Sequence, residues 1–210
     1  MNKIMRITLT AMLLCTMTAC VPSKESAAKN TVNSYFVSLE EGNLDDAYKY
    51  LDTNTADNFS SLKDAENQMT TMLDQYNVSD VTKQLFSDAF NGIVKLCIKS
   101  HKITHTEKVS DAEYKITTTA SILDSDDITN AISSIDSNSF FTDISSKVME
   151  KYTNEGETAA MEYMMTEMAN WLTSSFSSAL SNLQPSDQTI VATVDKKDND
   201  WLITSLEEQK

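Results

Sequence analysis

Apolar residues in the first part of the chain recur at steps of three and four residues. This spacing, which places them on one face of a helix, predicts a helix over residues 28–39. Gly42 follows where a helix commonly ends in the left-handed conformation. Asn43 is then placed to cap a short second helix that carries Ala47 and Leu51.

The same spacing continues before it gives way to alternation. Residues 57–76 and 78–97 are predicted to be two further helices, with Gly92 as a candidate end of the second. Residues 98–109 then alternate, and residues 113–123 are rich in Thr, Ile and Tyr. These two segments, separated by turn residues, predict a β-hairpin.

The second half of the chain repeats the order of helices followed by strands. A helical region begins at about residue 126, and its longest helix is predicted to start at Asn154, with Glu157 as the partner in a capping box. Residues 189–195 and 201–206 are strand-like and flank a Lys/Asp/Asn turn, which predicts a second hairpin.

The helix over residues 154–183 carries an unusual number of methionines on its apolar stripe. Such a stripe is either a core-facing surface or an adaptable groove for an apolar ligand or partner helix. We favour the core, because the other side of the helix is uniformly polar. We therefore expect Met164, Met168 and Leu172 to be buried within the chain and not to form a free groove. The polar side consists of Glu162, Thr166, Asn170 and Ser174.

The N-terminus has the three zones of an export signal. Lys3 and Arg6 precede an apolar stretch over residues 7–15, which is shorter than the ~20 residues that span a bilayer. Met17-Thr18-Ala19-Cys20 follows and resembles the bacterial lipobox, although Met17 stands where Leu is usual. The alternative is an ordinary signal peptide followed by a chance cysteine.

The lipobox resemblance implies a lipoprotein. Residues 1–19 would be removed as a signal peptide, and Cys20 would carry the lipid. Residues 20–27 would then be the lipidated cysteine and a short tether, which places the body at the extracytoplasmic face of the bacterial cell membrane, or at the outer membrane in a Gram-negative host. Two or three acyl chains would hold it firmly, because each buried CH₂ contributes ~0.8 kcal/mol.

Charge and cysteine content agree with an exported body above a membrane. Removal of Lys3 and Arg6 leaves 15 basic against 31 acidic residues, a net charge of −16. Such acidity argues against nucleic acid and anionic lipid headgroups as partners. Cys97 is the remaining cysteine besides Cys20, so no internal disulfide is expected. Its apolar neighbours favour a buried small hydrophobe over a reactive thiol.

Several residues together resemble a known fold family. Tyr35-Phe36, Leu39, Gly42-Asn43, Ala47 and Leu51 resemble the opening of nuclear-transport-factor-2-like domains in uncharacterised, mainly Gram-positive lipoproteins. The hairpin at 98–123 and the ending, where Trp201 and Ile203 follow a Lys/Asp turn, are similar to the same domains. The resemblance covers residues 27–51, 98–123 and 188–206.

This resemblance implies an α+β fold in which N-terminal helices pack on a curved antiparallel sheet around a cone-shaped cavity. Residues 28–210 would form a single domain, with a helical pair inserted at about 126–183. The family hosts many functions, so no activity follows. Our leading hypothesis is a non-catalytic domain that binds a small apolar ligand or an envelope protein. The alternatives are a cavity enzyme and an interaction module that uses the inserted helices.

The residues that bear chemistry are few. His101 and His105 would share one face of a strand and would need Glu107 or Asp111 to complete even a weak metal site, so surface histidines are favoured. No glycine-rich phosphate loop or nucleophile elbow is present. We therefore assign no catalytic, metal or cofactor-binding residue and no cofactor.

Two acidic clusters are interpreted as structural. Asp124-Ser125-Asp126-Asp127 begins like a calcium loop, but Thr129 and Ile135 replace the glycine and glutamate that such a loop needs. We interpret it as a helix start capped by Asp126 or Asp127. The run from Asp198 to Asp200 is interpreted as a hairpin turn.

The lipobox makes a direct prediction. Replacing Cys20 by alanine removes the sulfur that would receive the lipid, so Cys20→Ala is expected to release the protein from membranes or to leave its precursor uncut. Fractionation and mass measurement of the product test this. Full processing with retention on the membrane would show that the interpretation is wrong.

Overall fold

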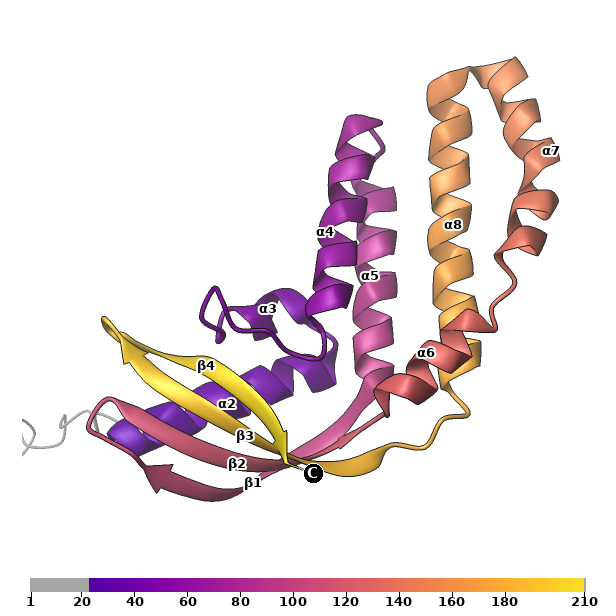
Figure 1. The fold of residues 1–210 in the computed structure, drawn as a ribbon. Helices are drawn as coiled ribbons and strands as arrows, with labels where there is room; N and C mark the ends of the chain where they lie inside the picture. The colour runs from indigo at the N-terminus through magenta and orange to yellow at the C-terminus, as the bar shows by residue number, and fades with distance from the viewer. Residues whose placement is uncertain (1–22, 210) are drawn as a thin grey trace, which may run out of the picture.

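The computed structural model describes residues 23–209, and it has an α+β fold, as the sequence predicts (Figure 1). The predicted signal peptide and Cys20 lie outside the described residues. The helices and strands follow in the order α2 (Lys24–Glu41), α3 (Leu44–Tyr48), α4 (Ser60–Gln75), α5 (Asp80–Cys97), β1 (Ile98–Lys108), β2 (Glu113–Ile122), α6 (Ser125–Ser133), α7 (Ser137–Glu155), α8 (Glu157–Leu180), β3 (Ser186–Lys197) and β4 (Asp200–Gln209).

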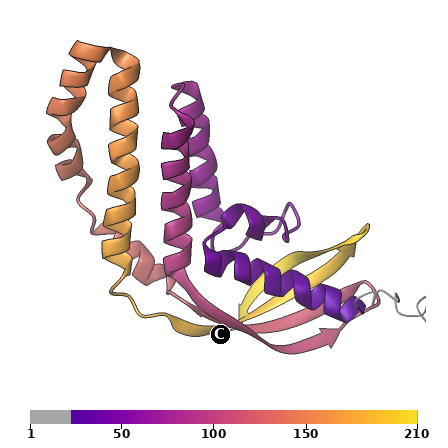
Figure 2. The same cartoon turned by 180° about the vertical axis from the view of Figure 1, so that it is seen from behind.

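The four strands form one antiparallel sheet in the order β1-β2-β3-β4. The prediction of a single sheet is confirmed. Helices α6, α7 and α8 lie between β2 and β3 in the sequence, and yet these two strands are neighbours in the sheet. The inserted helices predicted at about 126–183 therefore leave the sheet and return to it, as both views show (Figures 1 and 2).

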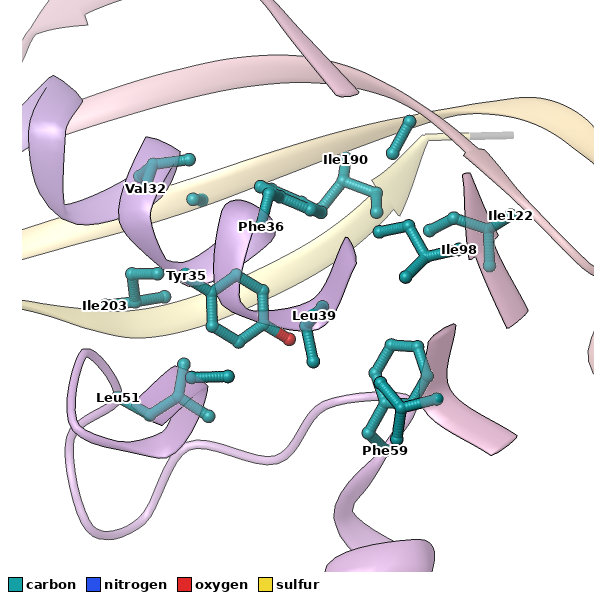
Figure 3. Packing of buried hydrophobic residues seen from close by; sticks show 14 of the residues in the cluster. Val32, Tyr35, Phe36, Leu39, Leu51, Phe59, Ile98, Ile122, Ile190 and Ile203 are labelled. Atoms are coloured by element: carbon teal, nitrogen blue, oxygen red, sulfur yellow. The ribbon is translucent and has the colours of Figure 1, made fainter. Parts of the chain in front are cut away.

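The main core lies between α2 and one face of the sheet. Strand β2 alternates strictly, with its even-numbered residues from 114 to 122 buried. Val32, Phe36 and Leu39 of α2 pack against this face together with Ile190 of β3 and Ile203 of β4 (Figure 3). Burial of each such side chain contributes ~1.5–3 kcal/mol, so this layer holds α2 to the sheet.

The start and the end of α2 have distinct caps. The Ser23 hydroxyl oxygen accepts a hydrogen bond from the Ser26 backbone N–H at 3.1 Å, so the helix begins at Lys24, inside the segment predicted to be a tether. Gly42 ends α2 with φ 78°, as predicted, and a Cβ there would lie 2.5 Å from the Asn91 backbone oxygen. Only glycine fits both the backbone conformation and this close approach.

Gly92 does not end a helix, contrary to expectation. Helix α5 continues through it to Cys97 and passes directly into β1 at Ile98. The residues that follow Gly92, Ile93 and Val94, are buried against the core. Their packing outweighs the ~1 kcal/mol by which glycine weakens a helix.

Two predicted helix starts are displaced. Asn154 belongs to the last turn of α7, and Gly156, with φ 92°, separates α7 from α8. The predicted capping box is therefore absent, because the helices are separated at Gly156, two residues after Asn154. Helix α6 is capped by Asp124, not by Asp126 or Asp127, whose backbone N–H groups donate to the Asp124 carboxylate at 2.8 and 3.2 Å.

The apolar stripe of α8 is only partly covered. Met165 and Ala169 are buried, as the core interpretation requires. The three residues predicted to be buried, Met164, Met168 and Leu172, are only half-buried, so that prediction is wrong in part. The reason is tertiary, because α5 and α7 pack on two sides of α8 and leave a strip between them open (Figure 1).

The polar side of α8 also differs from expectation. The Glu162 carboxylate accepts hydrogen bonds from the Ser79 backbone N–H at 2.9 Å and from the Ser79 and Thr82 hydroxyls at 2.5 Å each. Thr166 lies 2.9 Å from the same Thr82 hydroxyl. These contacts join α8 to the N-terminal turn of α5, where backbone N–H groups and the helix dipole favour a negative charge.

We predict that Glu162→Ala lowers the free energy of unfolding by about 1 kcal/mol at neutral pH, because the start of α5 loses its acceptor. Burial opposes ionisation of Glu162, but the hydrogen bonds from Ser79 and Thr82 outweigh it and hold its pKa below the ordinary value. Because the pKa of Glu162 is lower in the folded than in the unfolded protein, the ionised carboxylate stabilises the folded state at pH values above its unfolded pKa of about 4.3. This stabilisation is lost as the pH falls through the folded-state pKa.

Urea unfolding at pH 7 and at pH 3 measures this difference, which is expected to shrink at pH 3. Asn170→Ala is the control, since Asn170 is exposed on the same helix, and it should change stability by less than about 0.5 kcal/mol. Equal effects of the two substitutions would show that the contact with α5 contributes nothing.

Candidate functional site

The first candidate site is the cavity between α2, the loop before α4 and the sheet. Its volume is about 200 Å³. It is lined by Tyr35, Phe36, Leu39, Ala56, Asp57, Asn58, Phe59, Ile122, Ile190, Leu206 and Glu208. Ligand pockets usually enclose ~300–1,000 Å³, so this one is small for an organic ligand. Phe36, Phe59 and Ile190, which belong to this lining, are among the buried residues in Figure 3.

Asp57 lines this cavity and is a candidate for an acid or base in it. Its carboxylate accepts hydrogen bonds from the Tyr35 hydroxyl at 2.5 Å and the Tyr48 hydroxyl at 2.6 Å. It also accepts from the Ser60 hydroxyl at 2.9 Å and the Phe59 backbone N–H at 3.0 Å. Both carboxylate oxygens are thus engaged, and the group fastens the loop before α4 to α2 and α3.

The two tyrosines are held in their neutral form. Burial is the main reason that the pKa values of Tyr35 and Tyr48 lie above the ordinary tyrosine value, and the Asp57 carboxylate raises both further. A protonated tyrosine that donates to a carboxylate is neither a nucleophile nor a base. Sequence reasoning missed this cluster, because Asp57 lies in a loop and its tyrosine partners are 22 and 9 residues away in the chain.

We predict that Asp57→Ala lowers the free energy of unfolding by about 2–3 kcal/mol, because the buried Tyr35 hydroxyl is left without an acceptor. Tyr35→Phe removes the donor instead and should cost about 1 kcal/mol. Denaturant unfolding measures both. Asn58→Ala, at the exposed neighbour, is the control, and a loss as large as that of Asp57→Ala would contradict this role.

The sequence predicts that the two histidines share one face of a strand, but in the structure they lie on opposite faces of β1. The register shifts between Ile103, which pairs with Thr118, and His105, which pairs with Thr117. This β-bulge turns His105 to the outer face, where it is exposed. His101 faces α2, so the structure does not bring the two histidines together.

His101 instead joins the edge strand to α2. Its Nδ1 lies 2.7 Å from Glu40 Oε1, and its Nε2 lies 3.2 Å from Asn33 Oδ1. Its ring stacks on Phe36 with centroids 5.1 Å apart. The side chain is therefore a structural link, with both ring nitrogens engaged by oxygen atoms. In the described part of the chain, no group of three or more His, Cys, Asp or Glu side chains could hold a metal ion.

Cys97 and the acidic turn behave as predicted. Cys97 is buried at the end of α5, where burial raises the pKa of its thiol to about 11. A thiol with so high a pKa is unreactive at neutral pH. Asp198, with φ 52°, lies between β3 and β4 and makes the hairpin turn.

The second candidate site is an open apolar groove of about 550 Å³ formed by α4, α5 and α8. Gln68 is the one polar side chain of its lining. Figure 1 shows α4 and α8 on either side of α5, which forms the floor. The lining residues are Leu62, Ala65, Gln68, Met69, Met72, Ala89, Phe90, Ile93, Leu172 and Phe176. We call this feature the methionine groove.

A second groove of about 420 Å³ lies between α7 and α8. It is lined by Phe141, Ile144, Ser145, Val148, Met149, Tyr152 and Met164. Phe141, Met149 and Tyr152 are 52%, 65% and 56% exposed, which is unusual for large apolar side chains. Met164, Met168, Leu172 and Phe176 follow at steps of four along α8 and connect the two grooves.

The two grooves have the character of a binding surface. Their linings contain no titratable acid or base except the Tyr152 hydroxyl, so they offer apolar contact and no proton transfer. Flexible methionine side chains adapt to partners of different shape. Within residues 23–209, no helix is long and apolar enough to span a membrane.

Comparison with known proteins places the chain in a family. No curated protein and no solved structure matches it. One family model, described as a domain of unknown function (DUF4878), matches residues 21–126, half of the chain. The match runs from the start of α2 through β2 and the first residues of α6, so it includes α4 and α5 but not α8. The chain therefore belongs to the DUF4878 family.

Proposed function

We propose that the protein is a lipid-anchored, extracytoplasmic binding protein without catalytic activity. Its body would be a nuclear-transport-factor-2-like domain, and its binding surface the methionine groove. Four features support the proposal: the lipobox ending at Cys20, the acidic composition, the helices packed across a curved sheet, and the apolar lining of the groove.

The observation that carries the proposal is the contrast between the two candidate sites. The cavity between α2 and the sheet, the cone, leaves about 200 Å³, and Asp57, one of the two acids that line it with Glu208, already accepts four hydrogen bonds. The methionine groove leaves about 550 Å³ and is open. Apolar surface left in water favours a partner, because its removal from water contributes roughly 25 cal/mol per Å².

The proposed anchor and the groove are compatible in space. Helix α2 begins at Lys24, four residues after the proposed lipid site at Cys20, and this start lies at one end of the molecule. The paired helices α4–α5 and α7–α8 lie at the other end in both views (Figures 1 and 2). A lipid at Cys20 would therefore leave the groove accessible.

The insertion has a direct part in this function. Helix α8 supplies one wall of the groove through Leu172 and Phe176, and α4 and α5 supply the other wall and the floor. This arrangement favours binding through the inserted helices over binding of a small ligand inside the cone. A cavity enzyme is the less favoured alternative, because Asp57 is bonded to Tyr35 and Tyr48 and Glu208 is the one acid of the cone lining outside this cluster.

Binding of the neutral fluorophore Nile red tests the site. We expect it to bind the chain that is produced without residues 1–19 and carries Cys20→Ala, in the methionine groove, with affinity at least fivefold lower in Met69→Gln and Leu172→Gln. These substitutions place an amide in an apolar wall, and an amide without a partner costs ~1–3 kcal/mol. Fluorescence titration gives the affinities.

Asn170→Ala is the matched control on the exposed side of α8, and it should bind as the parent does. Leu206→Gln reports on the cone, which Leu206 lines. If Leu206→Gln alone lowered binding, the cone and not the groove would be the site. Thermal melting of each variant verifies that it is folded.

A further inference from the structure

Helices α4, α5 and α8 occupy three positions of a four-helix bundle. Helix α5 packs against both α4 and α8 (Figure 1), and the methionine groove is lined by residues of all three helices. Helix α7 does not fill the fourth position, because it packs on another side of α8. A helix laid in the groove would complete the bundle, with apolar residues at steps of three and four against Met69, Leu172 and Phe176.

The length of the groove sets the length of its guest. The longest run of lining residues, from Leu62 to Met72 on α4, extends for about 15 Å at ~1.5 Å per residue. A guest helix of about 11 residues covers this length, and a 15-residue peptide extends past it by about one turn. Helix-in-groove recognition uses such amphipathic segments, and methionines on the walls tolerate different apolar faces.

The helices that form the groove carry more acidic than basic residues. Helix α8 carries Glu157, Glu162 and Glu167 and no basic residue, with Glu162 bonded to the start of α5, and α5 carries two acidic and two basic residues. Helix α4 carries three acidic residues and a single lysine, Lys63, which is held by Asp45 at 2.5 Å and Glu66 at 2.9 Å. The whole chain has 31 acidic and 17 basic residues, so its field attracts cations.

We propose that the methionine groove binds a free cationic amphipathic peptide in helical form. The proposal rests on the proposed function and specifies its ligand. The apolar face of the peptide lies against the methionines of α4 and α8, and its lysine-rich face points to solvent in the acidic field of the protein. A second copy of the chain is a poorer guest, because two such acidic bodies repel each other.

If the protein is anchored at the membrane, it would compete with the membrane for such a peptide. Cationic amphipathic helices bind anionic membrane surfaces through apolar burial and charge attraction. An acidic acceptor fixed beside the membrane competes with the lipid for the same peptide. The protein would thus lower the amount of such peptides that reaches the bilayer.

The test uses the mature, lipidated protein in nanodiscs of zwitterionic phosphatidylcholine, with empty nanodiscs as baseline. The probe is a dye-labelled synthetic 15-residue helix with leucines on one face and lysines on the other. Fluorescence anisotropy should show binding above the baseline, at least tenfold weaker for the same peptide with glutamines in place of lysines. Binding should also weaken as salt is raised, because salt screens the attraction.

Met69→Gln and Leu172→Gln should each weaken peptide binding about tenfold, and Asn170→Ala should leave it unchanged. Equal binding of the lysine and glutamine peptides would overturn the cationic ligand while leaving the groove as a binding site. Absence of binding by both peptides, with Nile red still bound, would overturn the helical guest alone. A stable dimer in sedimentation that Leu172→Gln dissociates would show that a second copy fills the groove.

Discussion

The packing of α2 across the buried face of the sheet is the contact on which the rest of the structure depends. Phe36 and its apolar neighbours on α2 fill the concave face, and Tyr35 reaches Asp57 in the loop before α4. The same contact nearly closes the cone, leaving about 200 Å³. A domain that uses its cone for its own core has little room there for a ligand. Larger apolar hollows lie on α4, α5, α7 and α8.

The helices outside this layer are attached to it rigidly enough to hold a groove. Helix α5 passes into β1 without a loop, so α4 and α5 are carried on an edge strand of the sheet. Helix α8 is attached to α5 by Glu162, which caps the start of that helix, and by the buried pair Met165 and Ala169. The groove is thus a consequence of how two helical hairpins are joined, and its walls come from segments about 100 residues apart in the sequence.

Asp57, His101 and Cys97 are candidates for chemistry in the described part of the chain, and each is engaged within the fold. Asp57 holds tyrosines, His101 holds the edge strand to α2, and the Cys97 thiol is buried. Each of these groups stabilises the fold. The surfaces left without such a role are apolar and lie on α4, α5, α7 and α8. An acidic body with an apolar groove suits a partner that is itself apolar on one side and cationic on the other.

The amino-acid sequence by itself determined the elements, the sheet and several caps. Periods of 3.6 and 2 residues are local properties, and so are Gly42 at a helix end and Asn43 at a helix start. It did not determine which side of α8 is covered, because Met164 and Met168 have the same local pattern as the buried Met165. It did not reveal the β-bulge that separates His101 from His105, or the contact of Glu162 with α5. Only the tertiary structure decided these points, since burial and register depend on which helices and strands become neighbours.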